Sequence, residues 1–545
     1  MTKKHNLIVG LVLALNILIV WLPIQFQTAG IQEEWRIRAV FDGNITTYGD
    51  SGNDTADEIF YTRPIIGILN HIAYLITPDS FVSHHLILIG LLLAKGLMLC
   101  LILRNLLPDF PLWGYLCALL LIFYPSDPAI VSLRVIHTHL AIVMILSSIF
   151  FLIQYYQHHQ RRYLIAMWVS QIIAGFTIEI GYPIFFFTPL IILIMEKRIS
   201  KRFIITTILF YIVPAITFLY SIILILVVQI SWQRTAIAPY TIRDYVKNIF
   251  NLYNYNFVTA WQNIIDNIVQ ATTTDLFVLG ATVLTTFIGG VLIIRGQPKQ
   301  RFNRAMLIRL GVVLISGVFA VLLGYAMFLP SRTHVLTDYR VYLLSSIGLA
   351  IVIGTLGYTL FLIVSKKAIQ YLVLLGLSSI IGLSGVFASK THDDYLAISE
   401  QQEIIVRQIT DAVPALKDHA YIVIKTQSNS IAKLNIGEMQ KPVLFTPMLQ
   451  FLYDDYEQLQ AGIMCFTDYL SCEFTPTGLD IIATNYTGIE STIPYNQIIL
   501  FRITKQGELT LIEADETLPN YDPAHLIDTN APPPHRIQTV YGDAD

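Results

Sequence analysis

Charged residues are scarce in this chain of 545 residues. Asp, Glu, Lys and Arg make up 13% of the sequence, about half of the roughly 25% typical of soluble domains. Apolar residues make up 54%, and the mean hydropathy is +0.59. This composition excludes a soluble enzyme. No set of carboxylates and histidines has the spacing of a metal site, so we expect no obligatory metal and no other obligatory cofactor.

Cysteine is also rare, with four residues in the whole chain. Cys100 and Cys117 lie in apolar stretches, where we expect inert core residues. Cys465 and Cys472 lie in the polar C-terminal region, and their spacing matches no common zinc signature. We therefore expect a disulfide between these two, formed in an oxidising compartment.

Long apolar stretches dominate what is present. A stretch of about 17–25 apolar residues spans a bilayer, and the chain has roughly eleven stretches of this kind. They lie near 6–25, 84–103, 112–124, 138–156, 163–178, 180–195, 203–228, 274–294, 307–329, 341–364 and 368–387. The first could be a cleaved signal peptide, but Trp21, Pro23 and Phe26 stand where a small-residue cleavage site is expected, which favours a retained anchor. The pattern predicts an α-helical polytopic membrane protein with about 11 transmembrane helices.

Basic residues gather in every second connection between these stretches. Those connections hold 16 of the 26 basic residues before residue 388, from Lys3 and Lys4 to Lys366 and Lys367. Positive charge stays cytoplasmic, so the N-terminus is predicted inside and the C-terminal region outside. We expect a multi-pass protein of a plasma membrane, specifically a bacterial inner membrane.

The hydropathy pattern divides the chain into three parts. Residues 1–387 form the transmembrane domain, with long outer loops at 27–83 and 229–273. Residues 388–518 suggest a small extracytoplasmic α/β domain, with a helix over 395–413 and strands over 420–425 and 497–504. Residues 519–545, rich in proline, predict an extended tail. From residue 388 onward there are 9 basic and 22 acidic residues, a net charge of −13, which argues against a nucleic-acid partner.

Both outer loops carry segments suited to the membrane interface. Pro64 to Ile76 is apolar but only about 13 residues long, too short to span, and suits a helix lying in the interface. The loop 229–273 is rich in aromatic residues: Trp232, Tyr240, Tyr245, Phe250, Tyr253, Tyr255, Phe257 and Trp261. Interfacial helices are the favoured interpretation of this loop, and a sugar-binding platform is the alternative.

Polar side chains at the predicted outer face form four clusters. These contain Glu33, Glu34 and Arg36; Tyr61 and Arg63; Asp127, Arg134, His137 and His139; and Arg332, His334, Asp338 and Arg340. Glu179 lies at a short turn between two apolar stretches, and Lys95 lies within one. A charge near hydrocarbon costs roughly 2.5–3.5 kcal/mol on insertion scales, so such residues usually line a site or a pathway. The alternatives are solvated loop acids for the glutamates and a packed ion pair within the bundle for Lys95.

Several motifs follow one another along the chain: the acidic pair Glu33-Glu34, the stretch Tyr61-Thr62-Arg63-Pro64, His85 at the head of the next apolar stretch, the turn at Pro125, the lone Glu179 before Pro183, and Arg340 with Tyr342. In this order they resemble the GT-C membrane glycosyltransferases that use polyprenyl-phosphate sugars, related to the protein O-mannosyltransferases. The resemblance covers residues 1–387. It implies a GT-C fold and a membrane lipid-linked sugar as donor, with a protein or glycan as acceptor.

The resemblance also implies roles for individual residues. Glu33 or Glu34 would be the catalytic base that takes a proton from an acceptor hydroxyl. Arg340 is the first choice for the donor phosphate, with Arg134, Arg332 and Lys95 in reserve, because cationic groups stabilise the leaving phosphate. The supporting residues would be Arg63, Asp127, His137, His139, Glu179 and Asp338.

The chain departs from the family pattern at three places. Both residues of the acidic motif are Glu where the family usually has Asp, Ser126-Asp127-Pro128 replaces a His-rich turn, and Lys95 stands near where some relatives keep a His. A different sugar or acceptor would explain these changes. So would a catalytically silent membrane scaffold whose acidic outer domain binds partner proteins. A transporter is the third hypothesis, but the chain has no paired half-chain repeats.

Overall fold

The computed structural model describes residues 3–21, 35, 63–196, 199–227, 240–268, 271–295, 304–330, 341–426, 442–454, 458–466, 472–481, 492–503 and 508–541. The chain divides into two compact units. The first comprises residues 1–25, 61–66 and 86–392, and the second comprises 26–60, 67–85 and 393–545. The division within the C-terminal half falls at His392. The first unit differs from the expected transmembrane domain of 1–387 in that residues 26–60 and 67–85 group with the second unit.

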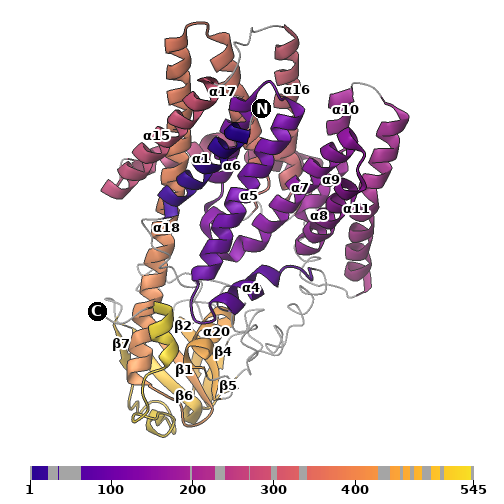
Figure 1. Ribbon diagram of the computed structural model, residues 1–545. Coiled ribbons are helices and arrows are strands. Elements are labelled where there is room, and N and C mark those ends of the chain that lie inside the picture. Colours follow the sequence, from indigo (N-terminus) through magenta and orange to yellow (C-terminus); the bar gives the residue numbers. More distant parts are fainter. Residues whose placement is uncertain are drawn as a thin grey trace. The chain divides into compact units, whose positions relative to one another are not determined.

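The first unit is entirely helical in its described part (Figure 1). Its α-helices are α1 (Lys3–Trp21), α5 (Val82–Leu106, which begins in the second unit), α6 (Pro111–Phe123), α7 (Ile136–His158), α8 (Arg161–Thr177), α9 (Tyr182–Phe187), α10 (Leu190–Glu196), α11 (Lys201–Val227), α13 (Ile242–Asn254), α14 (Ala260–Ile268), α15 (Thr273–Arg295), α16 (Arg304–Tyr325), α17 (Ser346–Ile363) and α18 (Lys367–Ala412). Shorter 3-10 helices are η2 (Pro128–Val131), η3 (Leu133–Val135), η4 (Glu179–Gly181) and η6 (Ala326–Phe328), and a π-helix, η5, covers Tyr255–Thr259.

Seven helical segments of the described chain are long and apolar enough to cross a membrane. Three further apolar helices are shorter: Asn6–Trp21, Pro111–Phe123 and Glu179–Leu193. Together with the second unit described below, they confirm the predicted fold class, a polytopic helical membrane protein with a small C-terminal α/β domain.

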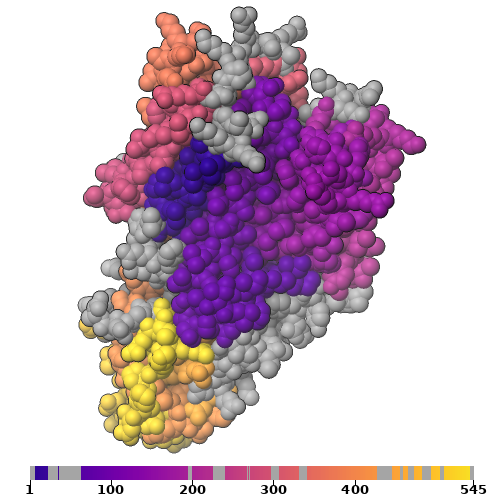
Figure 2. Space-filling view, viewed as in Figure 1, coloured from indigo at the N-terminus to yellow at the C-terminus, as the bar shows by residue number. Residues whose placement is uncertain are grey.

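Polar side chains join the spans around α1. The Thr285 hydroxyl on α15 donates to Asn16 Oδ1 on α1 over 2.8 Å, and the Tyr115 hydroxyl on α6 donates to the Thr286 carbonyl over 2.8 Å. Such bonds stabilise helix packing where no water competes for the groups. The first bond fixes α1 against α15, and the second fixes α6 against α15. Figure 2 shows the indigo surface of α1 beside the rose surface of α15.

Helix α18 is longer than the sequence predicted. It is a single helix of 46 residues that begins in the first unit and ends in the second (Figure 1). The sequence pattern separated it into a membrane span over 368–387 and an amphipathic helix over 395–413. The residues between these two segments include no Pro or Gly, so nothing interrupts the helical hydrogen bonds where the hydropathy falls.

The second unit is built on two small sheets. The larger has strand order β2-β1-β6-β7, with β1 (Ala420–Thr426) parallel to both β2 (Leu459–Phe466) and β6 (Ile498–Ile503), and β7 (Leu509–Leu511) antiparallel to β6. The smaller is antiparallel, in the order β3 (Cys472–Thr475), β4 (Gly478–Ile481) and β5 (Thr492–Ile493). The unit also contains α4 (Ile68–Ile76), α20 (Pro442–Tyr453), η8 (Tyr495–Gln497), η9 (Pro523–His525) and α21 (His535–Tyr541).

Strand β1 is the centre of the larger sheet. Ile422, Val423 and Ile424 are successive residues that point to alternate faces, and all three are fully buried, as expected of a central parallel strand. On one face α20 packs so closely that a Cβ added at Gly462 would meet Leu449 and Phe445. The strands predicted over 420–425 and 497–504 correspond to β1 and β6, which lie beside each other at the core of an α/β domain.

Aromatic contacts bring Trp35 into the second unit. Its ring lies 5.2 Å from Phe81 and 5.9 Å from Phe451 on α20, between ring centroids, and the side chain is buried. Arg536 on α21 covers the Phe451 ring, with its guanidinium 4.5 Å from the centroid. Part of the first long loop thus packs with the C-terminal domain.

The C-terminal residues differ from the expected extended tail. Ile527 pairs with Leu416, and α21 follows the three prolines at 532–534. The Ile537 N–H donates to the Pro534 carbonyl over 3.2 Å, so the last proline precedes a helical turn. Proline, which has no N–H, is tolerated there because the first N–H groups of a helix have no carbonyl partner within the helix.

Candidate functional site

The most polar part of the first unit begins where a short helix, α6, ends within the thickness of the membrane. Helix α6 has 13 residues, about 20 Å of helix, whereas the hydrocarbon core is about 30 Å thick. The chain then continues from Tyr124 to Val135 without α-helix, through η2 and η3. Non-helical backbone at membrane depth is tolerated only where protein buries it or it lines an aqueous cavity. Nearly all of this segment is buried, which satisfies that requirement.

Asp127 holds this irregular segment in place. Its Oδ1 accepts the Ala129 N–H over 2.9 Å, which starts η2, and its Oδ2 accepts the Tyr342 N–H over 3.0 Å. Tyr342 precedes α17, 215 residues further along the chain. The carboxylate therefore joins two stretches of non-helical backbone that enter the bundle from separate parts of the sequence.

Lys95 provides the opposite charge. It is the fourteenth of the 25 residues of α5 and is 0% exposed. It interacts electrostatically with Asp127, which is 2% exposed, and also with His139. The Lys95 Nζ makes no hydrogen bond to any residue that the structure describes. Asp127 therefore acts on Lys95 across a gap, without a hydrogen bond or a direct ion pair between the two side chains.

Arg63 and Glu179 form a second pair. Arg63 Nε donates a hydrogen bond to Glu179 Oε2 over 2.7 Å, and Arg63 Nη2 donates one to Glu179 Oε1. The guanidinium therefore binds both carboxylate oxygens. Their side chains are only 15% and 23% exposed. The Ile65 N–H also donates to the Phe176 carbonyl over 3.2 Å beside the pair. Glu179 interacts electrostatically with His137, which in turn interacts with His139.

Hydrogen bonds join Arg63 to Glu179, and longer-range electrostatic interactions relate the other residues. We call these six residues the buried polar chain: Arg63, Glu179, His137, His139, Lys95 and Asp127. Its two cations and two carboxylates balance. His139 Nε2 lies 3.2 Å from the Ile130 carbonyl and so ties the chain to η2. Charges at membrane depth are costly and usually functional. Here Arg63 and Glu179 are paired directly, while Lys95 and Asp127 interact without direct contact.

An aromatic cluster lies next to Asp127. The Tyr342 ring stacks on Tyr255 of the π-helix η5 at 4.7 Å and on Tyr325 at 5.6 Å between centroids. Tyr124 donates its hydroxyl to the Asn256 carbonyl over 2.9 Å. The Tyr342 hydroxyl is buried and makes no hydrogen bond within the described residues. The aromatic loop of the sequence therefore contributes Tyr255 to the packing of the bundle instead of presenting it as an open platform.

The residues predicted from the sequence fall into two groups. Arg63, Asp127, His137, His139, Glu179 and Lys95 all belong to the buried polar chain, and Arg134 is half-buried in η3, where its N–H donates to Ser132 Oγ over 3.3 Å. Glu33, Glu34, Arg332, Asp338 and Arg340 lie outside the described residues. Tyr342 was not predicted as a site residue, although its place in the Arg340-Val-Tyr342 motif was a signal.

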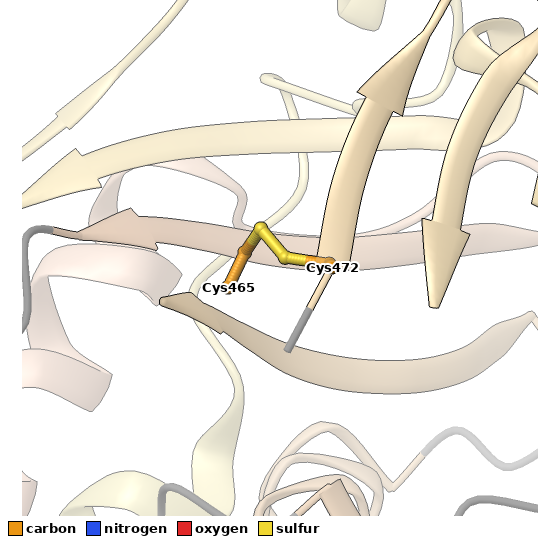
Figure 3. The surroundings of a disulfide bond; sticks show 2 residues. All are labelled: Cys465 and Cys472. Carbon is orange, nitrogen blue, oxygen red and sulfur yellow. A yellow bond between two sulfur atoms is a disulfide. The ribbon is translucent and has the colours of Figure 1, made fainter. Parts of the chain in front are cut away.

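Among the residues that the structure describes, no group of three or more His, Cys, Asp or Glu side chains could hold a metal ion. In the second unit, Cys465 at the end of β2 and Cys472 at the start of β3 are joined by a disulfide bond (Figure 3). The bond ties the three-stranded sheet to the four-stranded one. Cys100 and Cys117 are buried free thiols in the first unit.

Comparison with known proteins gives a weak likeness. No family model and no curated protein sequence matches the chain. The structure is similar to the crystal structure of ArnT from Cupriavidus metallidurans bound to undecaprenyl phosphate, with 14% identity, 83% of this chain and 85% of that chain covered, and a TM-score of 0.37. The apo state of the same protein gives 12% identity, coverage of 82% and 83%, and a TM-score of 0.35.

Proposed function

We propose that this chain is a GT-C-type glycosyltransferase that moves a sugar from a polyprenyl-phosphate donor to an acceptor hydroxyl at the outer membrane face. One observation carries the proposal: motifs far apart in the sequence meet in the fold. Arg63 of the Tyr-x-Arg-Pro stretch binds Glu179, and Asp127 of the proline turn binds the N–H of Tyr342, the last residue of the Arg-x-Tyr motif.

The buried polar chain supports the reaction without reacting itself. Arg63 and Glu179 are paired with each other, and Asp127 and His139 are occupied by backbone groups. Removing one member of a buried pair would leave an uncompensated charge, which is strongly destabilising. We therefore assign Lys95, whose ammonium is enclosed beside Asp127, the role of a counter-charge, and leave the donor phosphate to Arg340, Arg134 and Arg332.

The base would be Glu33 or Glu34. It takes the proton of the acceptor hydroxyl as the hydroxyl oxygen attacks the anomeric carbon, and the bond from that carbon to the phosphate oxygen breaks with its electron pair leaving on the phosphate. One displacement inverts the anomeric centre. The arginines stabilise the charge that develops on the phosphate. Glu34 directly precedes Trp35, whose burial against Phe81 and Phe451 gives the C-terminal domain a means of restraining the acidic motif.

The topology proposed with this function keeps the N-terminus cytoplasmic and the second unit extracytoplasmic, in a plasma membrane. The disulfide supports it, because disulfides persist in oxidising compartments. The acceptor would be a protein or a glycan on that side.

The test of the base is a pair of substitutions, Glu33→Gln with Glu34→Gln, assayed for transfer from a labelled polyprenyl-phosphate sugar. We expect a loss of at least about 100-fold, the contribution of a general base. The matched control is Glu473→Gln, an exposed residue of β3, which should retain full activity. Full activity in a well-folded double variant would rule out the proposed base.

The alternative function is a catalytically silent scaffold. The net charge of −13 from residue 388 onward favours it, because an acidic domain can recruit partner proteins by charge. A stable stoichiometric complex with a basic protein, with no lipid-linked sugar bound, would support the scaffold over the enzyme.

A further inference from the structure

Helix α13 exposes a row of large apolar side chains. Ile242 is 84% exposed, Val246 61% and Phe250 69%. They are spaced four residues apart, so they lie above one another on one face of the helix. We call these three residues the apolar ladder. A contiguous exposed apolar surface of this kind marks contact with a membrane or with another protein.

The opposite face of α13 is fixed in the first unit. Leu252 is buried in the aromatic cluster with Val321 and Tyr342, and Asn248 is buried as well. The Tyr253 hydroxyl donates to the Val318 carbonyl of α16 over 2.8 Å. The orientation of the helix is therefore set by packing, and the apolar ladder faces away from the bundle.

The contact with α16 places α13 at membrane depth. Helix α13 lies between the end of α11 and the start of α15, two candidate spans, so it is on the side of the membrane where α16 also ends. Val318 is seven residues before Tyr325, the end of α16, which corresponds to about 10 Å along the helix. The C-terminal turn of α13 thus contacts α16 two turns before the end of α16, at the level where acyl chains begin.

Two cations accompany the apolar ladder. Arg243 and Lys247 directly follow Ile242 and Val246 and are exposed. Asp244 is turned to the start of the helix, where its Oδ2 accepts the Thr241 N–H over 2.8 Å in a capping box. A helix with a strong apolar face flanked by Lys and Arg is the form that lies in the membrane interface and attracts anionic lipids.

We infer that α13 is a membrane-surface helix: its apolar ladder inserts among the acyl chains of the adjacent leaflet, and Arg243 and Lys247 bind the phosphate groups of anionic phospholipids. The depth of the Tyr253–Val318 contact favours lipid over a protein partner. The inference does not depend on the transferase reaction, and neither test below uses activity.

Insertion is tested with a nitroxide label at Phe250→Cys, in the full chain reconstituted into vesicles of phosphatidylcholine and phosphatidylglycerol. Collision with oxygen, which concentrates in lipid, is compared with collision with a water-soluble nickel complex. We expect the Phe250→Cys label to collide mainly with oxygen, and a control label at Glu473→Cys to collide mainly with nickel. If the Phe250→Cys label is as accessible to nickel as the control, the apolar ladder is in water and the inference fails; a surface reserved for a protein partner would give this result.

The lipid class is tested with Arg243→Gln and Lys247→Gln together. Both side chains are exposed, so the variant should keep the fold, which the midpoint of thermal unfolding checks. The relative affinity for spin-labelled phosphatidylglycerol over phosphatidylcholine should fall on the order of tenfold in the variant, because each cation near an anionic surface contributes to binding. An unchanged preference for the anionic lipid would overturn the role of the two cations.

Discussion

Arg63 and Glu179 are 116 residues apart in the sequence, and the Arg63 guanidinium binds both oxygens of the Glu179 carboxylate. The sequence predicts Glu179 at a turn between two spans and Arg63 before an interfacial helix, and it gives no sign that the two residues meet. The pair fixes the start of the segment leading to α4 against the turn between α8 and α9.

The Arg63–Glu179 pair predicts strong coupling between the two positions. Glu179→Gln alone should destabilise the protein by about 3 kcal/mol, the low end for broken buried pairs, because both side chains retain some exposure. Arg63→Met alone should cost a similar amount, and the double variant should cost clearly less than the sum. The measurement is a double-mutant cycle on unfolding in mixed micelles; a coupling energy below about 0.5 kcal/mol would show that the pair is not stabilising.

Lys95 and Asp127 predict non-additive losses of stability. Lys95→Met removes a buried charge that acts on Asp127, and Asp127→Asn removes the carboxylate that acts on Lys95, so each single variant should lower the midpoint of thermal unfolding. The combined Lys95→Met and Asp127→Asn variant should lose less than the sum of the two singles, because the charge interaction is removed as a whole; the loss of one of the two backbone bonds that Asp127 accepts should remain. Thermal unfolding of the purified proteins checks it. A combined variant as unstable as the sum of the singles is the result that the proposed interaction does not allow.

The packing of α16 against α17 predicts that any side chain larger than that of glycine at position 348 destabilises the protein. A Cβ at this position would lie against the Val321 backbone nitrogen and the Gly317 carbonyl oxygen, closer than van der Waals contact. Gly348→Ala should therefore separate the helices and destabilise the protein by about 1–3 kcal/mol. The matched control is Gly311→Ala in α16, where a Cβ meets nothing within 4 Å and the better helix propensity of Ala should help. Equal unfolding temperatures for the two variants would contradict this packing.

The disulfide predicts a local loss of stability. Cys465→Ser with Cys472→Ser opens a loop of eight residues, for which the chain-entropy model gives about 2–3 kcal/mol. The loss should appear in the second unit alone, as faster proteolysis of the C-terminal region with unchanged protection of the membrane helices. Wild-type protein treated with a reductant should behave in the same way. If neither the substitutions nor the reductant changes the rate of proteolysis, the disulfide contributes no stability.

The sequence predicted about 11 transmembrane helices, and the described residues contain seven helical segments long enough to cross a membrane and three shorter apolar helices. The seven leave a hydropathy signal of the right length, whereas α6, with 13 residues, does not. The sequence also placed the strands over 420–425 and 497–504 close to β1 and β6. It did not predict that α18 is one continuous helix, because hydropathy shows whether a helix lies in lipid or water and does not show where the helix ends. The tail after 519 was predicted from proline content alone, whereas Arg536, which binds Asp454 and covers Phe451, anchors α21.

The site was predictable only as a set of residue types. Rare charges beside apolar stretches identified Lys95, Asp127 and Glu179, since the cost of burying them is visible in the sequence. Their partners were not predictable, because the Arg63–Glu179 ion pair and the electrostatic interaction of Lys95 with Asp127 are tertiary and depend on helix packing. The bond from the Tyr342 N–H to Asp127 involves a backbone group, which leaves no trace in the sequence.

The most direct test of the proposed function is transfer by the wild-type chain itself. The purified protein in vesicles is given a polyprenyl-phosphate sugar carrying radiolabel in the sugar, and the water-soluble and lipid fractions are separated after incubation with a membrane extract as the source of acceptors. The account predicts that label leaves the polyprenyl phosphate, appears on an acceptor with inverted anomeric configuration, and does so only with the acidic motif intact. Label that stays entirely on the donor, in a protein shown to be folded by its thermal transition, would contradict it and leave the scaffold function in its place.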